Sequence, residues 1–177
     1  MGRYKENMED DLKYTFSNVN DWLRFAEAKS AILIGGCATM CIAIGQSLIK
    51  DEVSGLLELY LTLMVIQLLF GLLISLISFV PSLNIIWLFR SGEKSDRDNL
   101  LFFEHISKYT PTEYLVTLNP SESSYKFSKM EKYLAQQIVA NSVIARKKYI
   151  LFKAAIWLVV SGLVTPVFAF ILWMIKN

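Results

Sequence analysis

The stretch from Lys126 to Ile175, KFSKMEKYLAQQIVANSVIARKKYILFKAAIWLVVSGLVTPVFAFILWMI, decides the fold. Its first half is charged and amphipathic, and its second half is apolar and long enough to cross a bilayer. No obvious helix breaker precedes Gly162, which predicts one long helix that enters the membrane near Lys147, Lys148 and Lys153. A change around residues 125–145 in water would therefore be transmitted mechanically into lipid. This continuity indicates a membrane signalling or effector protein rather than a soluble enzyme.

The composition is that of a membrane protein. Of the 177 residues, 54% are hydrophobic, and they are gathered into long uncharged runs. The net charge of +2 gives no strongly basic field, so nucleic acid is not an expected partner. Cys37 and Cys41 lie four apart in an apolar run and indicate no redox compartment. The first thirty residues carry eleven charges, which argues against a removable signal peptide.

Residues 1–30 are predicted to form a cytoplasmic N-terminal arm followed by a lead-in helix. Residues 1–20 are polar and acidic in patches, which predicts a loosely held arm. A helix is expected from about Asp21, with Asn20 as its cap, because Trp22, Phe25 and Ala26 share one face. This helix leads directly into the first apolar run.

Residues 31–89 are predicted to contain two transmembrane helices with an interfacial exit. The first, at 31–49, is nineteen residues without a charge, close to the ~20 that a bilayer requires. Its small residues would admit another helix, from the same chain or from another copy: Gly35, Gly36, Thr39, Ala43 and Gly45. The second, at about 59–80, carries Gly71, Ser75 and Ser78 on one face. Pro81 and Asn84 then mark a kink or exit, and residues 85–89 are expected at the interface.

A third span is predicted at 154–175. Gly162 and Pro166 can bend it, with a static kink favoured over a moving hinge, and Ser161 and Thr165 can satisfy the freed backbone groups. Of the lysines and arginines, five precede the first span, one lies between the first two spans, eleven fall in residues 90–153 and one follows the third span. The protein is therefore predicted to be multi-pass, with its N-terminus and residues 90–153 in the cytoplasm.

Residues 90–153 are predicted to form a helical cytoplasmic sensing region. A polar linker covers 90–99, a short helix over 100–109 would bury Leu101, Phe102 and Ile106 or their neighbours, and residues 119–124 would form a turn. Thr110, Pro111 and Glu113 fit the start of a further helix. The predicted fold is thus an all-α membrane protein with three transmembrane helices and a small helical cytoplasmic layer, whose last helix continues into the third span.

The residue types that carry chemistry do not form a catalytic or metal-binding set in the sequence. His105 has no cysteine or carboxylate at metal-ligand spacing and is interpreted as a surface or packing residue. No cofactor is expected. The groups able to bind a ligand lie on the cytoplasmic side and include Arg97, Tyr125, Lys126, Lys129, Lys132 and Tyr133. The alternative for the lysines is a solvated helix face.

Two further groups of polar residues have structural interpretations. The cations Arg146, Lys147, Lys148 and Lys153 are interpreted as membrane anchors beside anionic headgroups. Gln137 and Asn141 share an apolar stripe with Met130, Leu134, Ile138 and Ile144. They are expected to be buried and to need a partner, for which a helix–helix hydrogen bond is favoured over another chain or a ligand.

Three segments in a fixed order resemble the transmembrane effector family of the Pycsar bacterial anti-phage systems. They are RFAEAKSAILIG at 24–35, LLFFEHISKY at 100–109 and YLAQQIVANSVIARKKYILFKAA at 133–155. The family pattern has aspartate where this chain has Glu27. The resemblance covers about residues 20–160. It implies a partner cyclase that makes cyclic CMP or cyclic UMP, and a response that impairs the inner membrane.

The leading hypothesis is therefore a non-enzymatic, nucleotide-gated effector that acts on the lipid bilayer as a homo-oligomer. Lysine or arginine would hold the cyclic phosphate and tyrosine would stack on the base. Contacts between helices or copies would involve Gln137, Asn141, Gly35 and Gly71. The alternative is a non-catalytic membrane anchor whose cytoplasmic helices dock a partner protein. A membrane-bound enzyme is disfavoured because no catalytic set is visible.

Overall fold

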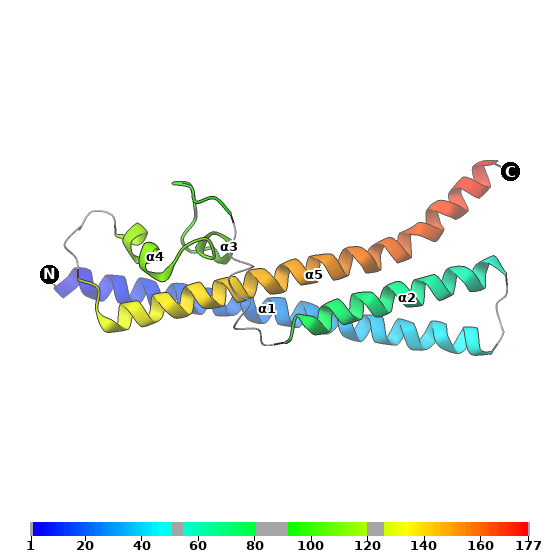
Figure 1. Ribbon diagram of the computed structural model, residues 1–177, viewed down its shortest axis with the longest axis horizontal. Coiled ribbons are helices and arrows are strands. Elements are labelled where there is room, and N and C mark those ends of the chain that lie inside the picture. Colours follow the sequence, from blue (N-terminus) through cyan, green and yellow to red (C-terminus); the bar gives the residue numbers. More distant parts are fainter. Residues whose placement is uncertain (1, 51–54, 81–91, 120–125, 177) are drawn as a thin grey trace. The chain divides into compact units, whose positions relative to one another are not determined.

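The computed structural model describes residues 2–50, 55–80, 92–119 and 126–176, with side chains over 8–50, 55–80, 92–119, 126–164 and 174. Its regular secondary structure in these ranges is entirely α-helical, which confirms the predicted all-α class. The helices in Figure 1 are α1 (Gly2–Ile49), α2 (Leu56–Ile77), α3 (Phe103–Ile106), α4 (Pro111–Leu118) and α5 (Lys129–Lys176).

Two helical segments, Met8–Ile49 and Leu56–Ile77, are long and apolar enough to cross a membrane. They contain the first two predicted spans, except that α2 ends at Ile77, just short of residue 80. The third predicted span lies inside α5, but the side chains of residues 165–173 and 175 fall outside the described residues, so it stays a prediction. Residues 81–90, with the predicted exit at Pro81 and Asn84, also lie outside the described residues.

The chain divides into two compact units. Unit 1 comprises Met1–Ala26 and Pro81–Tyr149, and unit 2 comprises Glu27–Val80 and Ile150–Asn177. Helices α1 and α5 are each 48 residues long, and each contributes residues to both units. The predicted continuity of the last helix is thus confirmed from Lys129 onward.

The N-terminal segment is helical and packed, so the predicted loose arm is wrong. Leu12, Thr15, Val19 and Ala26 are at most 2% exposed and form one stripe of α1. Charged residues occupy other faces, where Lys13 pairs with Glu9 at 2.8 Å. The acidic patches therefore belong to the outer side of an amphipathic helix that its apolar side holds in place.

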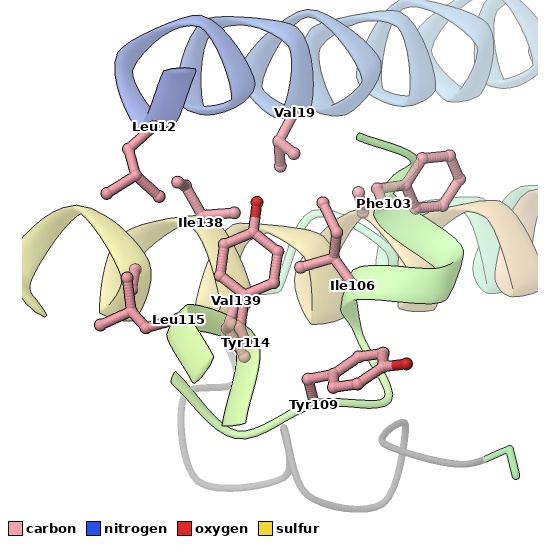
Figure 2. Close-up of a cluster of buried hydrophobic side chains, with 11 residues drawn as sticks. Leu12, Val19, Phe103, Ile106, Tyr109, Tyr114, Leu115, Ile138 and Val139 are labelled. Atoms are coloured by element: carbon pink, nitrogen blue, oxygen red, sulfur yellow. The ribbon is translucent and has the colours of Figure 1, made fainter. Parts of the chain in front are cut away.

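The core of unit 1 lies between α1, α5 and the short helices. Figure 2 shows Leu12 and Val19 of α1 pointing toward Ile138 of α5 and Tyr114 of α4. Tyr114 is fully buried, its hydroxyl donates to the Leu100 carbonyl at 3.1 Å, and its burial raises its pKa to about 12. The side chain of Asn18 donates to the Leu101 carbonyl at 2.8 Å. These bonds attach the segment around residue 100 to the core.

An aromatic cluster lies at the end of unit 1, close to Ala26 of α1 and Tyr149 of α5, beyond which both helices belong to unit 2. Phe103 stacks on Tyr149 with ring centres 5.0 Å apart, and Trp22 lies 5.7 Å from Phe103 and 6.3 Å from Tyr149. The predicted helix over 100–109 is only the four-residue α3, and Leu101 is 44% exposed whereas Phe103 and Ile106 are buried. Ile106 is thus buried as predicted, and Phe103, a neighbour of Leu101 and Phe102, takes the buried place against Trp22 and Tyr149.

Two capping boxes define the starts of α4 and α5. The Thr110 hydroxyl accepts from the Glu113 N–H while the Glu113 carboxylate accepts from the Thr110 N–H, as the sequence predicted. Ser128 and Glu131 make the same pair of bonds and start α5 at Lys129, three residues after the predicted start. Glu131 is 1% exposed, so this cap is part of the core of unit 1.

Unit 2 has a small core and a large apolar surface. Cys37, Met64, Leu68 and Val159 are buried together. Much of the rest of α2 is exposed, including Leu59, Leu63, Leu69, Phe70, Leu73 and Leu76. An exposed apolar surface of this extent is unusual for a soluble monomer and typical of a surface in contact with lipid.

Candidate functional site

The first turns of α5 present positive charge and one aromatic ring to solvent. Lys129, Lys132 and Tyr133 are exposed and lie at positions i, i+3 and i+4, which share a helix face. The Lys129 ammonium lies 5.6 Å from the centre of the Tyr133 ring, and Lys126 is exposed three residues before Lys129. Four of the six predicted ligand residues therefore lie within about two helical turns. Tyr125 lies outside the described residues.

Arg97 belongs to a different part of unit 1. It is exposed in the segment before α3, and its backbone N–H donates to the Ser95 hydroxyl at 3.2 Å. No hydrogen bond, ion pair or ring contact joins it to the cations of α5 among the residues that the structure describes. Arg97 is thus not brought together with the other predicted ligand residues.

Next to Arg97 lies a buried carboxylate that sequence reasoning missed. The Asp98 side chain is 5% exposed and accepts from the Lys108 ammonium at 2.6 Å, the Tyr109 hydroxyl at 3.0 Å and the Ser95 N–H at 3.1 Å. The hydrogen bond from Lys108, helped by those from Ser95 and Tyr109, lowers the pKa of Asp98 to about 2. The positive charge of Lys108 is thereby balanced by Asp98. This cluster therefore stabilises the segment between residues 95 and 109 and provides no unpaired positive charge that could bind an anion.

A second ion pair reinforces the same loop. The Lys94 ammonium donates to Glu113 at 2.7 Å, and this bond, with those from Thr110, lowers the pKa of Glu113 to about 2. His105 accepts from the Asn99 N–H through Nδ1 at 2.8 Å and packs edge-on against Phe102, which fits a packing residue. The described residues contain no cluster of histidine, cysteine or carboxylate side chains suited to a metal ion.

Asn141 makes a helix–helix hydrogen bond in unit 1. Its side-chain amide donates to the Asn20 side-chain oxygen at 2.8 Å, across 121 residues of sequence. Asn20 lies inside α1, so its predicted role as a helix cap is wrong. The partner of Asn141 is of the kind that the sequence favoured.

Gln137 is exposed, so its predicted burial is wrong. The buried stripe of α5 runs through Ala135, Ile138, Ser142 and Ala145, each 0% exposed and spaced alternately by three and four residues. Gln137 lies one residue, or about 100° of helix rotation, from this stripe. Met130 lies one residue before the buried Glu131, which extends this stripe, and Met130 is 53% exposed.

The predicted membrane anchors differ in exposure. Lys153 is exposed and Arg146 and Lys147 are half-buried, so headgroup contact stays a prediction for these three. Lys148 is only 8% exposed, and its burial disfavours direct contact with headgroups. On α1, Lys29 lies over the ring of Phe152, 5.7 Å from its centre.

The two predicted glycine contacts lie in different surroundings in unit 2. A Cβ atom at Gly71 would lie 2.9 Å from Cγ2 of Val159, so Gly71 serves packing between α2 and α5. A Cβ atom at Gly35 would meet nothing within 4 Å. The structure therefore leaves the Gly35 face of α1 open within the chain.

The membrane half of α5 also has a polar contact that the sequence did not reveal. The hydroxyl of Tyr60 on α2 donates to the Gly162 carbonyl at 2.9 Å. The Ser161 hydroxyl donates to the Leu158 carbonyl at 2.7 Å. The side chain of Thr165 lies outside the described residues.

Comparison with known families identifies the family of this chain. A family described as the Pycsar effector protein domain matches residues 11–175, which span both units. The chain belongs to the Pycsar effector family. The resemblance read from the sequence is therefore confirmed, and membership gives this Pycsar effector a role in anti-phage defence. Its apolar helices agree with a membrane location. Searches of curated proteins and of solved structures found no match.

Proposed function

We propose that this Pycsar effector binds cyclic CMP or cyclic UMP made by a partner cyclase, rearranges as a homo-oligomer and impairs the inner membrane. The observation that carries the proposal is α5 itself. One end of this 48-residue helix presents cations and a tyrosine ring to water, and its other half contains the apolar stretch 154–175. The protein acts by binding and rearrangement, and no catalytic step is required of it.

The ligand chemistry suits the first turns of α5. A cyclic nucleotide monophosphate carries one negative charge and one flat base. Lys129 and Lys132 on one face supply charge-assisted hydrogen bonds, and Tyr133, 51% exposed, offers a ring for stacking. Lys126 lies just before this face and completes the candidate set within the described residues.

The seam between α1 and α5 in unit 1 is the element that would respond. Its core is mainly apolar, with Leu12, Val19 and Ile138, and the Asn20–Asn141 hydrogen bond joins the two helices. A polar pair in such a seam specifies the register of two helices. A ligand that favours another packing of α5 against α1 shifts the population toward it. Because both helices continue into unit 2, the new register is transmitted along them.

In the membrane, the proposal uses three spans with the N-terminus and residues 90–153 in the cytoplasm. The open face around Gly35 on α1, with Thr39 four residues on, is the proposed contact between copies, since small residues let helices approach closely. Gly71 is already used within the chain. Lys147 and Lys153 would fix the depth of α5 beside anionic headgroups.

Binding is tested by isothermal titration of the full chain in detergent with cyclic CMP and cyclic UMP, with 5′-CMP as the control ligand. The K129A/K132A variant is expected to bind at least about tenfold more weakly, since each charge-assisted bond contributes roughly 1.5–3 kcal/mol. K13A, which removes an exposed lysine of α1, is the matched control and should bind as the wild type does. If neither cyclic nucleotide gives a heat of binding, the proposed gating by nucleotide is refuted.

A second candidate is an anchor whose cytoplasmic helices dock a protein. It is favoured by exposed apolar side chains in unit 1, namely Val116, Met130 and Tyr133. Expression in cells separates the two functions. An effector depolarises the cells, as read by a membrane-potential dye, once the cyclase is supplied, whereas an anchor leaves the potential unchanged at any level.

A further inference from the structure

Pro166 removes one hydrogen bond from the interior of α5. In an α-helix the N–H of each residue donates to the carbonyl four residues earlier, and proline has no N–H. The carbonyl that loses its donor is that of Gly162, within the apolar half of α5. Inside a bilayer no water replaces the lost donor, so another part of the protein must supply one.

Helix α2 supplies that donor. The Tyr60 hydroxyl lies 2.9 Å from the Gly162 carbonyl, 102 residues away in sequence, and 3.2 Å from the sulfur of Met64. A hydroxyl has a single proton, and a carbonyl is a stronger acceptor than a thioether, so the bond to Gly162 dominates. The orphaned carbonyl and the tyrosine of the neighbouring helix thus match in position and in chemistry.

The surroundings of Gly162 hold the two helices close enough for this bond. A Cβ atom at Gly162 would lie 2.5 Å from Oε1 of Gln67, and a Cβ atom at Gly71 would lie 2.9 Å from Val159. The Gln67 oxygen is the end of a flexible side chain and can move aside, whereas Val159 is short and buried, so Gly71 sets the close approach of α2 and α5. A methyl group at residue 71 would push α5 away from α2 and lengthen the bond from Tyr60.

We propose that Tyr60 is a positioning residue that latches α5 onto α2 at its proline break and keeps the resting membrane part of the protein closed to ions. The inference rests on the proposed function in placing residues 154–175 in lipid. When the latch opens, the Gly162 carbonyl is left without a donor and takes one from water, which gives water and ions a polar starting point in the apolar layer.

The test uses the full chain reconstituted in phosphatidylethanolamine–phosphatidylglycerol vesicles, with potassium efflux measured in the absence of any nucleotide. Y60F removes only the hydroxyl and is expected to raise the resting efflux about three- to tenfold, the size expected for one hydrogen bond between membrane helices. P166A returns a backbone N–H to residue 166, and this N–H can donate a hydrogen bond to the Gly162 carbonyl within α5. In the P166A background, Y60F should therefore change the efflux less than twofold.

Two further variants complete the design. G71A reaches the same bond by a separate route, through its methyl group against Val159, and should raise the resting efflux as Y60F does. Y14F removes a hydroxyl from an exposed tyrosine of unit 1, 66% exposed, and should leave the efflux unchanged. Circular dichroism of each variant in detergent reports whether it is folded.

The outcomes separate this inference from the proposed function. Equal efflux for Y60F and wild type overturns the latch, and so does an equal effect of Y60F with and without Pro166. A failure of cyclic nucleotides to change the efflux of any variant refutes the gating, but the coupling between Y60F and P166A is measured without nucleotide and still decides the latch.

Discussion

Replacing Gly71 with alanine probes the contact that joins α2 to α5 in unit 2. The new methyl carbon would lie 2.9 Å from Cγ2 of Val159 and 3.5 Å from the carbonyl oxygen of Ala155. Two carbon atoms are at their optimal separation at about 3.5–4.0 Å, so the helices must separate by roughly 0.6 Å or more. Neither helix has a long flexible side chain at this contact that could move aside instead.

Two opposing effects set the size of the change. Overpacking of this kind costs about 1–3 kcal/mol, while alanine in place of glycine inside a helix gains up to about 1 kcal/mol. The net expectation for G71A is a loss of about 1 kcal/mol, or about 2–4 °C in Tm for a chain of this size. G45A has only the gain, because its methyl group meets nothing within 4 Å, and should leave Tm unchanged or raise it.

Thermal unfolding of both variants in the same detergent, followed by circular dichroism, checks the difference in sign. In the double variant G71A/V159A the clash is removed, so its loss should be smaller than the sum of the two single losses by about 1–3 kcal/mol. If G71A and G45A shift Tm equally, or if the losses of G71A and V159A simply add, the close packing of Gly71 against Val159 is refuted.

Three further predictions concern unit 1. N141L leaves the Asn20 amide without its partner and should cost about 1–3 kcal/mol, whereas N20L/N141L should be nearly neutral; thermal unfolding of the three proteins decides. T110A removes the cap of α4 and should cost about 1 kcal/mol, with T110S as the control that keeps the hydroxyl. The pKa of Asp98 is lowered to about 2 by Lys108, so its contribution to stability is fully present above about pH 4 and is lost as the pH falls toward 2. D98N should flatten the dependence of Tm on pH over that range, and an unchanged slope would contradict the hydrogen-bonded arrangement.

The sequence predicted those parts of the fold that depend on one segment at a time. The charge-free runs located the segments now seen in α1 and α2, and Thr110 and Glu113 located the start of α4. The many charged residues of the N-terminal segment predicted a loose arm, whereas the spacing of its buried residues is that of an amphipathic helix. The signal was present, since Leu12, Thr15, Val19 and Ala26 repeat at spacings of three, four and seven residues.

In the candidate site, too, the sequence predicted only arrangements within a single segment. The face of Lys129, Lys132 and Tyr133 follows from helical spacing alone. The bond between Asp98 and Lys108 and that between Tyr60 and Gly162 depend on how separate segments pack, which no local pattern encodes. Pro166 predicted that the Gly162 carbonyl lacks its donor within the helix, but the sequence contains several hydroxyl groups that could supply one.

The passage of both α1 and α5 through the two units has a consequence for any measured affinity. On the proposed function, a nucleotide bound in unit 1 biases the packing of helices that lie in lipid. Linkage then requires the converse, that the lipid bias the nucleotide affinity by the same factor. Bilayers of different thickness, to which long helices adjust by tilting, should therefore give different dissociation constants for the same protein. The membrane is in this sense an allosteric ligand of the effector as well as its target.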